Sequence, residues 1–330
     1  MSELVKIEDP SGVSEARRLT RARALALGLD HDTVERAVLV ASEAATNLHR
    51  HAQNGRFSPT VSLAGDLVLL SIDDGPGMEN PDRMRQDGVS SGSSLGVGLG
   101  AMERLSDQFE LWSAPGRGTA AISVFKVPGA TPVPGGLEME GLRVNAPRQT
   151  VCGDVFAWRR TGRGVQLLLC DGFGHGAAAA RDADRIRDGF LAADGEAAQI
   201  LEALCHVPEV ERGAVAMVTD LSFEDQQITA AGVGNISGVV MSREDTRRIV
   251  SREGSIGRRC VVRPETYELP HGAMLILHSD GLKTFRRAEG HAHLFYRSSL
   301  LAAAVILREA LRGRDDASII VARARETRDG

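Results

Sequence analysis

A segment rich in proline and glycine, PGATPVPGG at residues 128–136, separates two parts of the sequence that have different patterns. Proline removes a backbone hydrogen-bond donor and glycine removes backbone stiffness, so this segment favours neither a helix nor a strand. The chain has 330 residues, enough for a separate hydrophobic core on each side of the segment. We therefore expect two unrelated domains, residues 1–127 and 137–330, joined by a linker over residues 128–136.

Composition and charge narrow the class of protein. Hydrophobic residues make up 42% of the chain and charged residues 25%, as in ordinary globular domains. The formal net charge is -5 and no strongly basic segment offsets it, which argues against nucleic-acid binding. No apolar stretch is long enough to cross a bilayer and the N-terminus lacks a signal-peptide core, so we expect a cytoplasmic protein without membrane contact. The cysteines lack metal-ligand spacing and are expected to be reduced, buried thiols: Cys152, Cys170, Cys205 and Cys260.

The first part alternates helical and strand-like patterns. Helices are expected near residues 11–29, 33–51 and 98–106, and strands near 60–63, 67–72, 108–113 and 119–126. Helices followed by an antiparallel run predict a layer of helices on a mixed sheet.

The second of these helices carries a polar pair opposite an apolar stripe. The stripe consists of Val34, Val38, Ala41, Ala45 and Leu48. Glu43 and Asn47, four residues apart, would lie together on the other side. An amide oxygen can bind Mg²⁺ and a carboxylate can take a proton from a hydroxyl. Considered alone, however, the pair is better explained as two exposed polar residues.

Two glycine-rich segments follow this helix. The expected strand at 67–72 runs into Asp73-Asp74-Gly75-Pro76-Gly77, where glycines allow the backbone to approach a ligand closely. Gly96, Gly98 and Gly100 stand just before a helix, whose free amides and dipole attract phosphate. One glycine-rich loop is weak evidence, but the helix, the acidic turn and this loop in that order predict a nucleotide site.

This order of motifs resembles the GHKL ATPase superfamily and, within it, the anti-sigma and stressosome serine protein kinases of the RsbT and RsbW type. The resemblance covers about residues 15–126 and rests on ASEAATNLHRHA, DDGPGM, DGVSSGSSLGVGLGAMERLSD and SAPGRGT. It implies a Bergerat-type domain that binds ATP and Mg²⁺. By this resemblance Glu43 would be the catalytic base, Asn47 would hold Mg²⁺ and Asp73 would bind the adenine amino group. The pocket would be shaped by Gly75, Gly77, Gly96, Gly98 and Gly100, with Thr119 near its rim.

The second part contains many short strands and four aspartates beside them. Strands are expected at residues 164–170, 213–221, 227–232, 273–278 and 317–323, with covering helices near 177–191 and 298–311, which predicts an α/β layered domain. Carboxylates that converge at one sheet edge repel each other unless cations lie between them, and two cations can activate a water for attack on phosphorus. Each aspartate alone is better explained as a turn cap. They are Asp154, Asp171, Asp280 and Asp315.

Together these motifs resemble the bacterial branch of the metal-dependent (PPM) serine/threonine phosphatases, of the SpoIIE and RsbX type. The resemblance covers about residues 142–323 and rests on CGD, DGFGHG, GVGNISG, SDGL and DDAS. It implies a layered β-sandwich that binds Mn²⁺ or Mg²⁺, with Asp171 bridging two ions and the Gly172 carbonyl assisting. The other ligands would be Asp154, Asp280 and Asp315, and Asp316 ranks below Asp315.

One departure from the eukaryotic branch leaves the proton donor open. Phe173 stands where that branch carries a histidine, and His175 is as compatible with a role in loop structure as with acid catalysis. His278 is expected to be a packing residue at the end of a strand.

The two resemblances imply a bifunctional regulator that phosphorylates and dephosphorylates serine on STAS-domain anti-sigma or stress-response proteins. Serine phosphorylation adds a charge near −2, enough to make or break a protein interface. One alternative is that the first part is an anti-sigma binding module with a sigma factor as partner. A second is that it senses ATP and controls a phosphatase. A third, a metabolic ATPase, would need a small-substrate pocket that the motifs do not indicate. The sequence leaves the substrate and the oligomeric state open.

Overall fold

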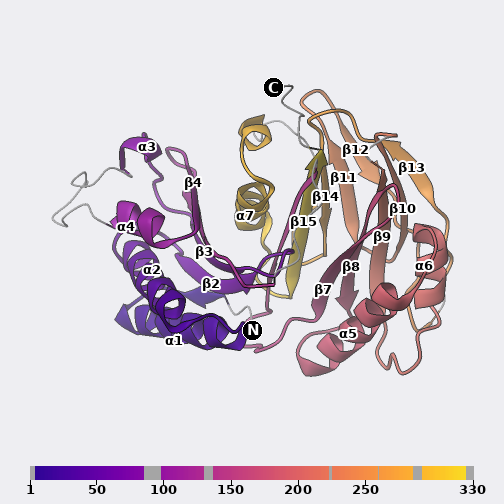
Figure 1. The fold of residues 1–330 in the computed structure, drawn as a ribbon, viewed down its shortest axis with the longest axis horizontal. Coiled ribbons are helices and arrows are strands. Elements are labelled where there is room, and N and C mark those ends of the chain that lie inside the picture. Colours follow the sequence, from indigo (N-terminus) through magenta and orange to yellow (C-terminus); the bar gives the residue numbers. More distant parts are fainter. Residues whose placement is uncertain are drawn as a thin grey trace. The chain divides into compact units, whose positions relative to one another are not determined.

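The computed structural model describes residues 4–84, 98–129, 137–222, 225–258, 260–284 and 292–324. The chain forms two compact units (Figure 1). Met1–Thr131 and Ala304–Glu309 make up the first, and Pro132–Ala303 and Ala310–Gly330 the second. Most of the predicted linker lies outside the described residues. None of the helices in the described ranges combines the length and hydropathy that a membrane crossing requires.

The first unit contains a five-stranded sheet, and helices α1 and α2 pack on it (Figure 1). All four strand pairings are antiparallel, in the order β1-β2-β3-β5-β4. The predicted layer of helices on a sheet is confirmed, but the sheet is antiparallel throughout the described residues rather than mixed. The strands are β1 (Val5–Lys6), β2 (Arg56–Val61), β3 (Leu67–Asp73), β4 (Gln108–Ser113) and β5 (Thr119–Phe125), and the helices are α1 (Pro10–Ala26), α2 (His31–His51), α3 (Pro81–Met84) and α4 (Gly98–Leu105).

The boundaries of α1 and α2 follow from their caps. Asp9 accepts the backbone N–H of Ser11 before α1, and Asp30 accepts the N–H of Thr33 before α2. These side chains satisfy donors that a helix start leaves open. Helix α1 ends earlier than predicted because Gly28 adopts a φ of 73°, which does not continue a right-handed helix.

Strand β2 begins earlier than the sequence predicted and contains Pro59. Ile7 donates to the carbonyl of Gly55, so alternate residues from Gly55 onward direct their backbone groups toward β1. Pro59 therefore faces that side, where the described part of β1 pairs with Arg56 and Phe57. A proline is tolerated there because, among the residues that the structure describes, no strand pairs with its missing N–H.

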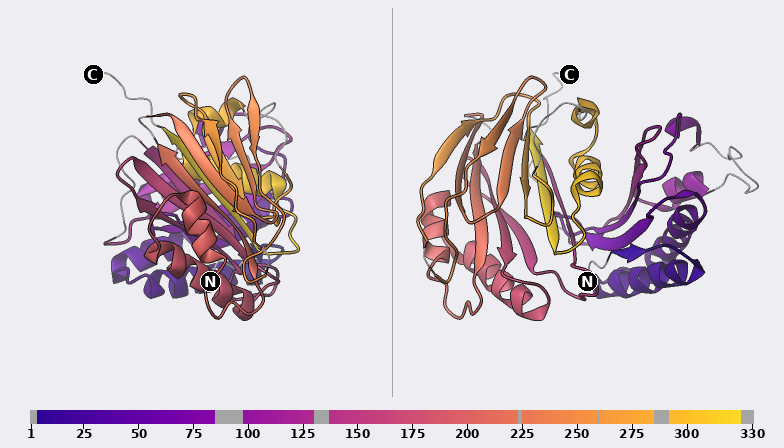
Figure 2. Two further views of the ribbon diagram at one scale, coloured as in Figure 1. Left: turned by 90° about the vertical axis from the view of Figure 1, so that its right-hand side faces the viewer. Right: turned by 180° about the vertical axis from the view of Figure 1, so that it is seen from behind.

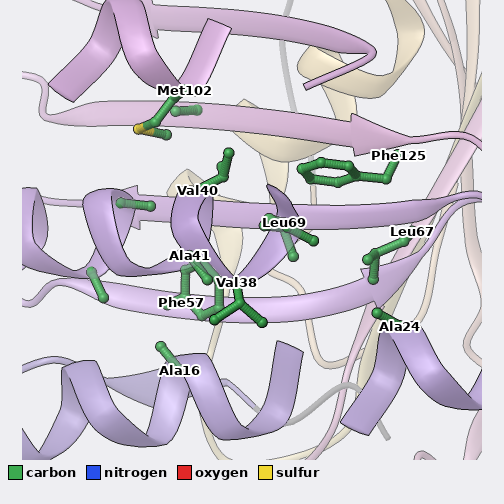
Figure 3. Close-up of a cluster of buried hydrophobic side chains, with 14 of the residues drawn as sticks. Ala16, Ala24, Val38, Val40, Ala41, Phe57, Leu67, Leu69, Met102 and Phe125 are labelled. Atoms are coloured by element: carbon green, nitrogen blue, oxygen red, sulfur yellow. The ribbon is translucent and has the colours of Figure 1, made fainter. Parts of the chain in front are cut away.

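The predicted apolar stripe of α2 is buried against the sheet. Val38 and Ala41 pack with Phe57, Leu67 and Leu69 in one hydrophobic cluster (Figure 3). Burial of such side chains stabilises the fold by roughly 1.5–3 kcal/mol for each larger one. This packing fixes the rotation of α2, so the polar face of the helix has a defined direction.

The second unit is a sandwich of two five-stranded antiparallel sheets (Figures 1 and 2). Helices α5 (Ala177–Ala192) and α6 (Ala197–Leu204) pack on the first sheet, in the order β13-β10-β9-β8-β7. Its strands are β7 (Asp154–Arg160), β8 (Gly164–Gly172), β9 (Ala214–Ser222), β10 (Gln227–Val233) and β13 (Glu265–Glu268). The second sheet has the order β12-β11-β14-β15-β6, with β6 (Leu137–Val144), β11 (Ser237–Met241), β12 (Thr246–Ile249), β14 (Met274–His278) and β15 (Ala317–Ala324). A 3-10 helix, η1 (Ala292–Tyr296), precedes α7 (Ser299–Ala310).

Several of these elements were missing from the sequence prediction. Strand β6 alternates buried and partly buried residues along LEMEGLRV, a period-two signal that the sequence does carry. Strand β7 begins directly at Asp154. Its neighbour in the same sheet is β8, and this pairing sets the geometry of the predicted metal site.

The expectation of four separate thiols was wrong for one pair. Cys205 and Cys260 form a disulfide between the end of α6 and a loop, across 55 residues of sequence. Cys152 and Cys170 are free, and Cys170 is buried. Spacing in the sequence gave no sign of the pair because the two residues meet only through the packing of α6.

Candidate active sites

In the first unit, the start of α4 lies beside the polar face of α2. A methyl group at Gly98 would lie 3.3 Å from Glu43 Oε2 and 3.3 Å from Asn47 Nδ2. Both side chains are half-buried. The Asn47 amide donates to Met102 Sδ at 3.9 Å, which directs its NH₂ group toward α4. Glu43, Asn47 and Gly98, predicted from separate motifs, are thus brought together.

Asp73 is the last residue of β3 and is buried at the turn that follows. Its Oδ1 accepts the N–H of Gly75 at 2.7 Å. Burial raises the pKa of the Asp73 carboxyl above its ordinary value, and the hydrogen bond from Gly75 acts in the opposite direction. A methyl group at Gly77, where φ is 69°, would lie 1.9 Å from the Ala114 carbonyl oxygen. The glycine is therefore required by a close approach of two backbones.

Thr119 lies directly opposite Asp73, because the two are register partners on β5 and β3. Ser113 Oγ lies 3.1 Å from Thr119 Oγ1 and accepts the N–H of Met78 at 2.8 Å. These hydrogen bonds tie the turn after β3 to the β4–β5 hairpin. Thr119 is thus beside Asp73 at one end of the sheet.

Sequence reasoning missed Gly118. Its φ is 67°, and a methyl group there would lie 2.1 Å from the carbonyl oxygen of Asp73. The motif SAPGRGT contained the signal, since a glycine directly before a strand often marks a positive φ. Gly100 is buried within α4, and the predicted Gly96 lies outside the described residues.

These residues fit a magnesium–nucleotide complex in their chemistry. A half-buried carboxylate and amide stand beside a helix start, where backbone N–H groups attract phosphate. A buried carboxylate at the end of β3 can accept a hydrogen bond from an amino group.

In the second unit, Asp154 and Asp171 are directly opposite each other on β7 and β8. Burial raises the pKa of Asp154 to about 7, with nearby Asp316 and Asp315 adding to the effect. Burial, followed by the charges of Asp154 and Asp280, raises the pKa of Asp171 to about 9. The charge of each of these aspartates therefore raises the pKa of its neighbours, which agrees with the predicted convergence of the carboxylates.

Asp280 follows β14 and is exposed. Its Oδ2 accepts the side-chain N–H of Asn235 at 2.8 Å. Asn235 belongs to the GVGNISG segment, and the sequence predicted no role for this residue. Its position was not predictable because the hydrogen bond joins two residues 45 positions apart.

The neighbouring aspartates at 315 and 316 have different surroundings. Asp315 is exposed, and its carboxylate accepts the N–H of Asp316. Asp316 is buried and accepts the N–H groups of Ala146 at 2.6 Å and Gly153 at 2.8 Å. The Asp316 carboxylate thereby holds the loop that leads into Asp154, while Asp315 stays accessible.

The DGFGHG loop after β8 is fixed by backbone contacts. A methyl group at Gly172 would lie 2.5 Å from the Ala179 carbonyl oxygen, so only glycine fits. Phe173 donates its N–H to the Gly213 carbonyl at 3.0 Å. His175 is exposed, and His278 is buried at the end of β14, as predicted for a packing residue.

The donors around Asp154 and Asp171 fit divalent cations, which prefer carboxylate oxygens. Asp154 Oδ1 is buried and has no hydrogen-bond partner among the described residues. A cation would supply that partner and would offset the repulsion that raises both pKa values. Within the described ranges, no three Asp, Glu, His or Cys side chains are already arranged around one ion position.

Comparison with known proteins agrees with this division of the chain. Residues 8–123 match the histidine kinase-like ATPase domain family, and residues 161–328 match the stage II sporulation protein E (SpoIIE) family. The chain is 33% identical to the serine/threonine-protein kinase RsbT of Bacillus subtilis over 118 residues, 35% of this chain and 89% of RsbT. It is 26% identical to the phosphoserine phosphatase RsbX of the same organism over 145 residues, 42% of this chain and 72% of RsbX.

Two solved structures share the fold. One comes from work on the bacterial stressosome as a modular system adapted to control secondary messenger signalling. It has a TM-score of 0.53 at 23% identity and covers 57% of this chain and 99% of its own. The other is RsbX in complex with magnesium, with a TM-score of 0.52 at 22% identity, covering 59% of this chain and 98% of its own. Both predicted resemblances are confirmed. Through residues 161–328 the chain belongs to the SpoIIE family, and through residues 8–123 it belongs with RsbT to the histidine kinase-like ATPases.

Proposed function

We propose that this protein is a bifunctional regulator that phosphorylates serine with ATP and removes phosphate from serine with metal ions. The observation that carries the proposal is that one chain contains both arrangements. Glu43, Asn47 and Gly98 converge in the first unit, and Asp154 opposes Asp171 in the second. The proposed domains are residues 1–127 and 137–330, with a linker at 128–136.

In the kinase domain, Glu43 accepts the proton of the substrate serine as its oxygen attacks the γ-phosphorus of ATP, and ADP leaves. Asn47 holds Mg²⁺, which neutralises the phosphate charge, and Asp73 accepts a hydrogen bond from the adenine amino group. The pocket is shaped by Gly75, Gly77, Gly96, Gly98 and Gly100, with Thr119 at its rim.

In the phosphatase domain, Asp154, Asp171, Asp280, Asp315 and the Gly172 carbonyl hold Mn²⁺ or Mg²⁺. When bound there, such ions would supply a water of lowered pKa and would offset the charge of the phosphate group. Asn235 orients Asp280, and Asp316 holds the loop before Asp154.

We propose a STAS-domain protein as the substrate of both domains. A protein substrate is supported by the likeness of the first unit to the serine/threonine-protein kinase RsbT. A cytoplasmic location stays a prediction, and the Cys205–Cys260 disulfide is an observation against it, because such bonds are rare in that reducing compartment.

The test is incubation of the full chain with labelled ATP and STAS-domain proteins of its own genome. Asp280→Asn should accumulate labelled STAS protein, because hydrolysis is lost and transfer continues. Glu43→Gln should bind ATP but leave every protein unlabelled, while Asn47→Ala should lose Mg-ATP binding in calorimetry. Labelling by Glu43→Gln at the wild-type rate would exclude Glu43 as the base.

The same variants separate the two alternatives. Capture of a sigma factor by Glu43→Gln, with no STAS protein labelled by wild type, would identify an anti-sigma binding module. Nucleotide binding without transfer by wild type, together with ATP-dependent hydrolysis of a phosphoserine protein, would identify an ATP sensor that controls a phosphatase.

A further inference from the structure

The carboxylate of Asp154 accepts a hydrogen bond from one of two paired, buried serines of the opposite sheet of the sandwich. Ser318, the second residue of β15, donates its hydroxyl to Asp154 Oδ2 at 2.7 Å. Ser279, directly after β14, pairs with Ser318, and hydrogen bonding from its side chain lowers the pKa of Asp154. Asp154 begins β7 of the other sheet. The aspartate is thus fixed from across the sandwich.

The two serines also hold each other. Ser279 Oγ accepts the backbone N–H of Ser318 at 3.0 Å, and the N–H of Ser279 donates to the Ser318 carbonyl at 3.1 Å. Both residues are fully buried. Since the Ser279 oxygen already accepts a backbone N–H, its proton is available to donate to Asp154. The two hydroxyl groups therefore have fixed positions, and that of Ser318 donates to Asp154.

The hydrogen bond from Ser318 occupies only one oxygen of this carboxylate. Asp154 Oδ2 accepts from Ser318, whereas Oδ1 is buried and has no partner among the described residues. An unpaired carboxylate oxygen in a buried site costs free energy, so a native structure that keeps one usually does so for a ligand. Asp171 lies directly across on the neighbouring strand.

We propose that Ser279 and Ser318 are positioning residues of the metal site. They fix the rotation of the Asp154 carboxylate so that Oδ1 stays available to a divalent cation shared with Asp171. This inference rests on the proposed metal-dependent phosphatase function. Partners of metal ligands orient the ligands, and their loss typically lowers metal affinity about 10–100-fold.

A purely structural role would have a different signature. If the serines only joined the two sheets, their loss would lower the melting temperature of the metal-free protein without changing the affinity for metal. Positioning predicts weaker binding even where the fold is intact. The two effects can be measured separately on the same variants.

The experiment is calorimetric titration of the full chain with Mn²⁺ in the absence of nucleotide, after removal of metal with a chelator. Ser318→Ala and Ser279→Ala should each weaken Mn²⁺ binding about 10-fold or more. Ser318→Thr, which keeps the hydroxyl, should retain most of the affinity. The double alanine variant should lose less Mn²⁺-binding free energy than the two single variants lose together, because both serines act on one carboxylate.

Thr219→Val provides the matched control. Thr219 is fully buried in β9 of the same unit, and its hydroxyl has no partner among the described residues. This variant should bind Mn²⁺ as the wild type does. Equal Mn²⁺ affinity for wild type, Ser279→Ala and Ser318→Ala would overturn the inference while leaving the phosphatase proposal standing. Failure of the wild type to bind Mn²⁺ would overturn both.

Discussion

Asp154 and Asp171 face each other as register partners on two adjacent antiparallel strands of the second unit. Directly opposed side chains in a sheet have β-carbons only about 5 Å apart, and like charges there destabilise the fold. Burial strengthens the effect and raises the pKa of Asp171 to about 9. The sheet thus maintains a repulsive pair that a divalent cation would stabilise.

Asp171→Asn should abolish the stabilisation of the protein by Mn²⁺ and should not destabilise the metal-free form. An Asp in an unfolded chain titrates near pH 3.9, far below the folded pKa of about 9. The folded state therefore binds more protons between these values, and the stability of the metal-free wild type falls as pH rises through this window. In Asp171→Asn, the stability of the metal-free protein should no longer show this fall with rising pH. Thermal melts in chelator and in Mn²⁺, from pH 5 to pH 9, measure both effects.

Asp315→Ala and Asp316→Ala should separate metal binding from folding. Asp316 accepts two backbone N–H groups from its buried position, so its loss should lower the free energy of unfolding by about 3 kcal/mol. Asp315 is exposed, and its loss should leave stability in chelator near that of the wild type while weakening Mn²⁺ binding. Urea unfolding and Mn²⁺ titration distinguish the two. The reverse pattern would contradict the assignment of Asp315 as the ligand.

Gly118→Ala should destabilise the first unit and impair ATP binding. Its added methyl group would meet the Asp73 carbonyl oxygen at 2.1 Å, so the turn that carries Asp73 would have to move. We expect the free energy of unfolding of the first unit to fall by about 3 kcal/mol. Gly116→Ala is the control, because Gly116 has a similar φ of 70° but nothing within 4 Å of the added methyl group. Gly116→Ala should lower the free energy of unfolding by only about 1 kcal/mol, because alanine is disfavoured in the left-handed backbone conformation. Equal losses of stability for Gly118→Ala and Gly116→Ala would show that the close approach of Gly118 to Asp73 does not affect folding.

Adenosine binding should weaken on acidification at a higher pH than for an ordinary aspartate. Burial raises the pKa of Asp73, and the ionised carboxylate is the better acceptor for an amino group. As pH falls through this raised pKa, protonation competes with the hydrogen bond. Adenosine, which lacks phosphates, is the suitable probe for calorimetry between pH 4 and pH 7. Asp73→Asn should bind weakly and without this pH dependence, so an unchanged profile in the variant would assign the titration to another group.

Sequence alone determined the parts of this protein whose signals are local. Cap residues such as Asp30, the apolar period of α2 and the short motifs around Asp73, Asp171 and Asp280 are contiguous, so each can be recognised without the fold. These signals sufficed for the two families and for the fold class. The alternation along β6 was also local, whereas the missed strands β11, β12 and β13 are only five, four and four residues long and carry little pattern.

Only the tertiary structure decided which distant residues meet. The disulfide of Cys205 with Cys260, the hydrogen bond of Asn235 to Asp280 and the serine pair on Asp154 join positions from 45 to 164 apart in the sequence. A single sequence records each residue's type and immediate neighbours, whereas these contacts follow from strand register and from the packing of one sheet on another. The close approach of Gly118 to Asp73 has the same origin, because pairing of β3 with β5 places the two backbones side by side.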